Sequence, residues 1–107
     1  MATLTKRDLV VRISSETGLA QSRVQDVIQQ TLDLMIEALA KGQNVELRNF
    51  GVLEVRLTRP RIGRNPNKPG SSFVIPPRAT VKFKAGKIMR QEVAKLSPVL
   101  QRKADRG

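Results

Sequence analysis

Apolar residues recur at helical spacing through the first forty residues of the chain. They predict one helix over residues 5–16, for which Thr5 is a good N-cap. Gly18 is placed to end this helix or to form the bend after it. The same period predicts a second helix from about residue 20 to residue 41, with Gly42 just beyond its end.

The apolar side chains of the second helix cover roughly half of its circumference, whereas a surface helix needs a stripe of only about 100°. Either this helix lies deep in a core, or part of its stripe contacts a second chain. The short chain favours the second interpretation, because it has little else to cover the stripe. Ala20 is a poor N-cap, so a start at Ser22 is an alternative. Five residues are expected in the interface between two chains: Val27, Leu34, Met35, Phe50 and Phe83.

After Gly42 the pattern changes to the alternation that is typical of strands. It predicts strands over residues 45–48 and 53–57, joined by a tight turn at 49–51 into a hairpin. Residues 58–72 are rich in Pro and Gly and have almost no apolar side chain, so they do not contribute to a core. This segment is either a disordered loop or an extended two-stranded arm.

The remaining residues predict a return to the body of the protein. An extended pattern resumes at residues 74–75, and residues 80–83 predict a returning strand. A last helix fits residues 86–96, and Ser97-Pro98 is expected to end it. The polar and basic residues 97–107 are then expected to form a loose, flexible tail.

Charge divides this chain of 107 residues, which is long enough for one domain and has a net charge of +11. Residues 1–47 hold five cations and six anions, whereas residues 48–107 hold fifteen cations and three anions. No acidic residue lies between Glu54 and Glu92, so nothing inside that segment neutralises its cations and we expect a polyanionic partner. The segment contains ten basic residues: Arg56, Arg59, Arg61, Arg64, Lys68, Arg78, Lys82, Lys84, Lys87 and Arg90.

Composition argues against catalysis and against cofactors. The sequence has no Cys and no His, which removes disulfides, thiolate zinc sites and the commonest general base. The acidic side chains of the second helix are interpreted as a solvated face rather than as a metal site. No apolar run reaches the length of a membrane span, so we expect an intracellular protein without a membrane partner and without enzymatic activity.

A hairpin arm with cations on both legs is suited to lie along a nucleic-acid groove and to meet phosphates on each side. The proline that ends Arg61-Ile62-Gly63-Arg64-Asn65-Pro66 adds an apolar wedge, a device that some proteins use to kink DNA from the minor groove. Two alternatives stay open at this point. One is an RNA-associated protein, such as a ribosomal or RNA-chaperone component, and the other is a module whose basic arm binds an acidic protein.

Several motifs give the chain a specific resemblance to a known family. They are Val45-Glu46-Leu47-Arg48-Asn49-Phe50-Gly51, Glu54-Val55-Arg56, Gly63-Arg64-Asn65-Pro66 and Phe83-Lys84-Ala85-Gly86-Lys87. In this order and spacing they resemble the HU/IHF histone-like DNA-binding proteins of bacteria, over about residues 3–94.

The resemblance implies an α+β fold, in which two chains form an intertwined dimer with a helical base, a short antiparallel sheet and two protruding β-ribbon arms. Residues 1–96 would form the DNA-binding domain, with the arm at about 56–80, in a homodimer or a heterodimer with a paralogous subunit. The family is itself a known case of minor-groove wedging and bending, which makes Pro66 the expected intercalating wedge and the bacterial nucleoid the expected location. HU-like and IHF-like binding both remain open. The residues expected to bind DNA are Arg56, Arg59, Arg61, Arg64, Asn65, Pro66, Lys68, Arg78, Lys82, Lys84 and Lys87.

Overall fold

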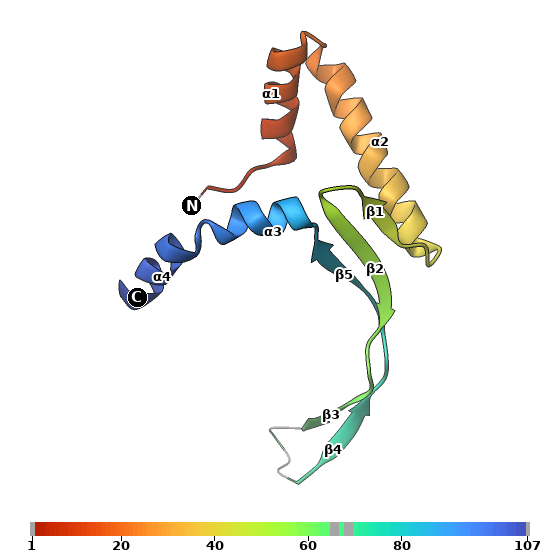
Figure 1. Ribbon diagram of the computed structural model, residues 1–107. Coiled ribbons are helices and arrows are strands. Elements are labelled where there is room, and N and C mark those ends of the chain that lie inside the picture. Colours follow the sequence, from red (N-terminus) through yellow and green to blue (C-terminus); the bar gives the residue numbers. More distant parts are fainter. Residues whose placement is uncertain (1, 65–66, 68–69, 107) are drawn as a thin grey trace. The chain divides into compact units, whose positions relative to one another are not determined.

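The computed structural model describes residues 2–64, 67 and 70–106 and has an α+β fold, as expected from the sequence (Figure 1). The chain divides into two compact units, Met1–Lys41 and Gly42–Gly107, each of which is described by itself. The first unit is helical. The second holds the strands and the last two helices.

Two helices, α1 (Lys6–Thr17) and α2 (Gln21–Ala40), make up the first unit. Thr5 caps α1 as predicted. Its hydroxyl accepts a hydrogen bond from the Asp8 amide at 3.2 Å, and the Asp8 carboxylate accepts one from the Thr5 amide at 2.9 Å. These bonds lower the pKa of Asp8, with the Thr5 amide as the larger cause. Gly18 ends the helix in the left-handed conformation, at φ 78°.

The second helix begins without a side-chain cap. Ala20 is the N-cap and makes no such hydrogen bond, so the alternative start at Ser22 is wrong. Among the described residues the buried hydrophobic side chains are Val10 and Val24, one on each helix. Two of the residues expected at a chain interface, Val27 and Leu34, are 64% and 56% exposed in the single chain.

The second unit contains a three-stranded antiparallel sheet in the order β1 (Val45–Leu47), β2 (Gly51–Leu57) and β5 (Ala79–Ala85). The predicted hairpin of the first two strands is confirmed. Its turn is closed by a 3.0 Å hydrogen bond from the Phe50 amide to the Leu47 carbonyl. Asn49 takes a positive φ of 67° there, a conformation that asparagine tolerates better than most residues.

Of the two possibilities for residues 58–72, the structure has the two-stranded arm. Strands β3 (Arg61–Arg64) and β4 (Ser72–Ile75) pair antiparallel as a separate sheet, which extends from the end of β2 and β5 (Figure 1). The two sheets share one register, since the pair Leu57↔Ala79 is followed four residues later by Arg61↔Ile75. The arm is therefore a continuation of the same ribbon.

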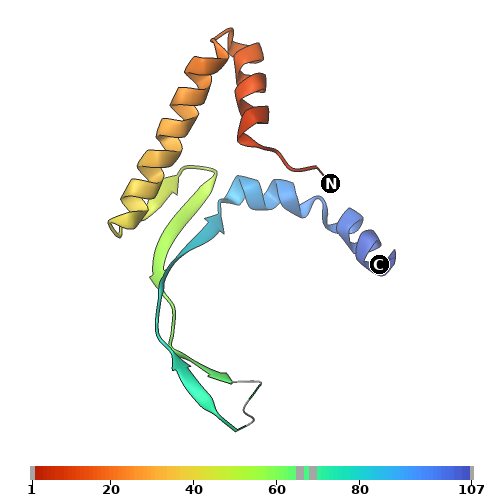
Figure 2. The same cartoon turned by 180° about the vertical axis from the view of Figure 1, so that it is seen from behind.

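Two helices follow the sheet, as both views show: α3 (Lys87–Ala94) and α4 (Ser97–Arg106) (Figure 2). The second contradicts the expectation of a structureless tail. Pro98 has no N–H to donate to the carbonyl of Ala94, so it separates the two helices. In the first turn of α4 no such donor is needed, and proline is well suited to begin a helix there.

Candidate nucleic-acid interface

The register of β2 and β5 sorts their side chains onto two faces, because neighbouring residues on a strand point to opposite sides. On one face the partners are Leu53↔Phe83, Val55↔Val81 and Leu57↔Ala79. On the other face they are Val52↔Lys84, Glu54↔Lys82 and Arg56↔Thr80. Four charged side chains, which we call the charged face, therefore lie together: Glu54, Arg56, Lys82 and Lys84.

Glu54 joins two of the predicted DNA-binding cations. Its Oε1 lies 2.9 Å from Lys84 Nζ, and its Oε2 lies 3.2 Å from Arg56 Nη2. The hydrogen bond from Lys84, followed by that from Arg56, holds the pKa of Glu54 below its ordinary value, so the carboxylate is charged at neutral pH. Its side chain is 23% exposed, less than either cation.

This pairing qualifies the sequence prediction. No acid lies inside the cationic segment, but Glu54 at its border neutralises two of its members. Glu54 and Arg56 share a face because they are two residues apart on a strand, a signal that was present in the sequence. Lys84 lies thirty residues away in the chain, and only the strand register brings it to the carboxylate.

Prolines mark the junction between the three-stranded sheet and the arm. The Thr58 amide donates to the Arg78 carbonyl at 2.9 Å, and the Arg78 amide donates to the Thr58 hydroxyl at 2.9 Å. Beyond this pair come Pro60 on one leg and residues 76–77, both proline, on the other. Because proline has no N–H, the ladder is interrupted there before β3 and β4 begin.

Within the arm, Phe73 covers Gly63. The two are partners in the register, and a methyl group at Gly63 would lie 2.6 Å from the Phe73 ring. The opposite face of the ribbon carries Ile62 and Val74, which are also partners and are both exposed. This places apolar and cationic side chains side by side on a slender ribbon.

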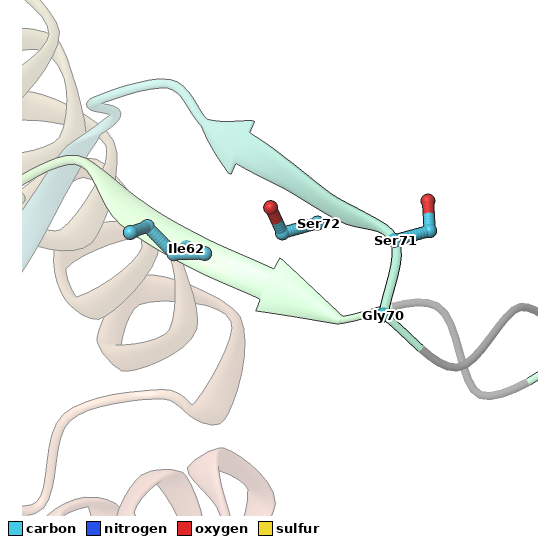
Figure 3. Close-up of a pocket in the computed structure, with 4 residues that line it drawn as sticks. All are labelled: Ile62, Gly70, Ser71 and Ser72. Carbon is cyan, nitrogen blue, oxygen red and sulfur yellow. The ribbon is translucent and has the colours of Figure 1, made fainter.

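Near the tip of the arm, a small hollow of about 400 Å³ lies beside the ribbon (Figure 3). Ile62, Gly70, Ser71 and Ser72 line it. The picture shows Ile62 and Ser72 on the two strands, with Gly70 and Ser71 at the turn. Hydroxyl and apolar groups line it without a charged side chain, and nothing in this lining is suited to catalysis.

The predicted DNA-binding residues follow the ribbon along both of its legs. Arg59 lies between β2 and β3, Arg61 and Arg64 lie on β3, and Arg78 precedes β5. On β5 are Lys82 and Lys84, and Lys87 is the first residue of α3. Except for Arg64, whose backbone alone is described, these side chains are exposed. Three of the predicted residues lie outside the described part of the chain: Asn65, Pro66 and Lys68.

Two of the residues predicted for a chain interface contact each other instead of lying apart. The rings of Phe50 and Phe83 have centroids 5.7 Å apart and are tilted by 57°. The Phe83 ring also lies over Gly51, where an added methyl group would come within 2.5 Å of it. The aromatic pair is therefore fixed to the turn before β2, and each ring remains partly exposed.

The sequence matches the family described as bacterial DNA-binding protein over residues 4–94. The chain belongs to this family. It is 44% identical over 91 residues to the probable DNA-binding protein HU of Chlamydia pneumoniae, covering 85% of this chain and 91% of the relative. It is 42% identical over 92 residues to the integration host factor subunit alpha of Caulobacter sp. (strain K31), covering 86% and 91%.

Solved structures agree with this assignment. The fold is similar to that of HU in a cocrystal structure of Anabaena HU with DNA, with a TM-score of 0.76 and 32% identity, over 85% of this chain and 98% of that chain. It is also similar to HU from Thermotoga maritima, with a TM-score of 0.59 and 26% identity, over 84% and 98%. The family resemblance drawn from the motifs is thus confirmed. None of the helices in the described part of the chain is both long and apolar enough to span a membrane.

Proposed function

We propose that the protein is an architectural component of the bacterial nucleoid, in the cytoplasm, that binds and bends double-stranded DNA through the minor groove. The observation that carries this proposal is the basic two-stranded arm, in a chain that belongs to the bacterial DNA-binding protein family. Arginine is suited to the narrow, electronegative minor groove, and the ribbon has arginines on both sides of its junction. The family description favours DNA over the RNA alternative.

The proposed binding unit is a dimer of this chain or of this chain with a paralogous subunit. Its support is the apolar face of the sheet, where Leu57 is 71% and Val81 is 52% exposed in the single chain. The exposed stripe of α2, with Val27 and Leu34, supports the same conclusion. A monomer would leave these side chains in water at a cost of about 25 cal/mol for each Å² of apolar surface. Sedimentation equilibrium of the purified chain measures the mass directly.

Binding is proposed to depend mainly on charge and on the deformability of DNA. Each phosphate neutralised by Lys or Arg releases a counterion, so affinity falls steeply with salt. Bending the duplex costs on the order of 1–6 kcal/mol, and contacts with the wrapped flanks offset that cost. Pro66 is proposed as the wedge that unstacks the bases at the bend, following its place in the Gly63-Arg64-Asn65-Pro66 motif.

The test of this function separates binding from bending. Fluorescence energy transfer between dyes at the two ends of a duplex is measured with the native chain, with Pro66→Ala and with Pro69→Ala as the matched control. We expect Pro66→Ala to retain much of the affinity and to lose bending, while Pro69→Ala bends DNA as the native chain does. An unchanged bend in Pro66→Ala would remove the wedge role, and absence of binding by the native chain would refute the function as a whole.

A further inference from the structure

The last helix, α4, lies outside the region that matches the family. The match ends at residue 94, which is also the last residue of α3. An amide–carbonyl hydrogen bond of 3.0 Å from Leu100 to Leu96 starts α4 as a separate helix. The structure therefore has an element that the proposed DNA-binding arm and sheet do not account for.

The two sides of α4 differ in character. Ser97 and Leu100 line a hollow of about 410 Å³ together with residues of α3 that include Met89 and Val93. At about 100° per residue, Arg102 lies on the side of α4 opposite to Ser97 and Leu100, and Lys103 lies between the two sides. The side that faces α3 is apolar, whereas the outer side is cationic.

The cations of α4 are available for a ligand. Arg102 and Lys103 are exposed, and within the described residues neither forms an ion pair. The Arg102 Nε donates only a long hydrogen bond of 3.4 Å to the Pro98 carbonyl. By contrast, Lys95 at the end of α3 is held by Glu92 at 3.0 Å. The unpaired cations thus begin only after the break between the helices.

The position of α4 in its unit suits contact with the same polyanion as the arm. In Figures 1 and 2, α4 continues from α3 away from β5, and the arm continues from the other end of β2 and β5. Both extend toward the same side of the sheet in these views. Lys87 and Arg90, which line a second hollow on α3, supply cations between the charged face and α4.

We propose that α4 is an additional DNA-contacting element, whose Arg102 and Lys103 bind backbone phosphates of the duplex beyond the segment held by the arms. This inference rests on the proposed function and extends it. Phosphate contacts carry no sequence information, so α4 adds affinity and length of contact without changing sequence preference. A longer DNA segment is then held than the arm and sheet alone would hold.

The test uses Arg102→Gln with Lys103→Gln in the full chain. Its matched control is Arg7→Gln with Arg23→Gln, which removes the same charge from exposed positions of α1 and α2. Two lost phosphate contacts flatten the slope of log K against log salt by about 1.8, so that between about 50 and 200 mM salt the native chain loses roughly tenfold more affinity than the variant. We expect this difference on a long duplex and not on one just long enough for the arms, and we expect the control to keep the native slope.

Equal slopes for the variant and its control on the long duplex would overturn the proposal. A changed mass of the free protein in sedimentation, with an unchanged slope, would assign α4 to contact between chains instead. Failure of the proposed function looks different, because the native chain itself would then bind no duplex.

Discussion

Replacing Glu54 by glutamine is expected to strengthen DNA binding and to make it more dependent on salt. In the free protein Glu54 holds both Lys84 and Arg56. A phosphate that binds either cation must displace the carboxylate, which then takes up a cation from solution and offsets the counterion released from DNA. Glutamine keeps the shape of the side chain but removes this competition.

The magnitude follows from the number of cations involved. Each phosphate contact contributes about 0.9 to the slope of log K against log salt, so release of two cations steepens the slope by up to about 1.8. Between about 50 and 200 mM salt this adds roughly a tenfold change in affinity. The ion pairs are partly exposed and weak, so we expect little effect on the stability of the sheet itself.

A titration followed by fluorescence anisotropy, repeated at several salt concentrations, measures the slope. The matched control is Glu37→Gln, which makes the same change in net charge and releases Lys41 from a 3.0 Å ion pair on α2, away from the charged face. A slope for Glu54→Gln that equals the slope for Glu37→Gln would show that the effect is one of net charge alone. The role given to Glu54 would then be refuted.

Two further predictions concern stability, each measured by urea denaturation at fixed protein concentration. Ala20→Ser supplies the missing acceptor at an N-cap that already has an extended backbone, so the free energy of unfolding should rise by about 1 kcal/mol, and no gain would contradict this account of the helix start. A methyl group at Gly51 would lie 2.7 Å from the Lys84 carbonyl oxygen in the backbone of β5, so Gly51→Ala should cost about 1–3 kcal/mol. Gly63→Ala meets mainly the exposed ring of Phe73, which has room to turn, and should cost much less; equal losses would contradict the difference in surroundings.

Elements with local signals could be predicted closely from the sequence. The capping of α1 needs only Thr5 and Asp8, three residues apart, and its end needs only Gly18. Strand alternation placed β2 and β5 and their two faces, because a period of two leaves no freedom once one face is apolar. Charge alone indicated the partner class, since an acid-free segment in a neighbouring ribbon has few other uses.

The misses have physical causes. Pro98 was interpreted as a helix end, which was right for α3, but the same residue begins α4, and the sequence at a proline does not tell which of these roles it takes. Ion pairing by Glu54 depends on a long-range partner, Lys84, that only the strand register identifies. The wedge at Pro66 lies outside the described residues and rests on its motif.

The proline-interrupted junction at Thr58 and Arg78 has a consequence for how such a protein diversifies. Since the ladder of β3 and β4 is separated from that of β2 and β5, substitutions that loosen or reshape the ribbon tip do not propagate into the folding of the body. The region that selects the DNA can therefore vary under selection while the platform that carries it stays the same.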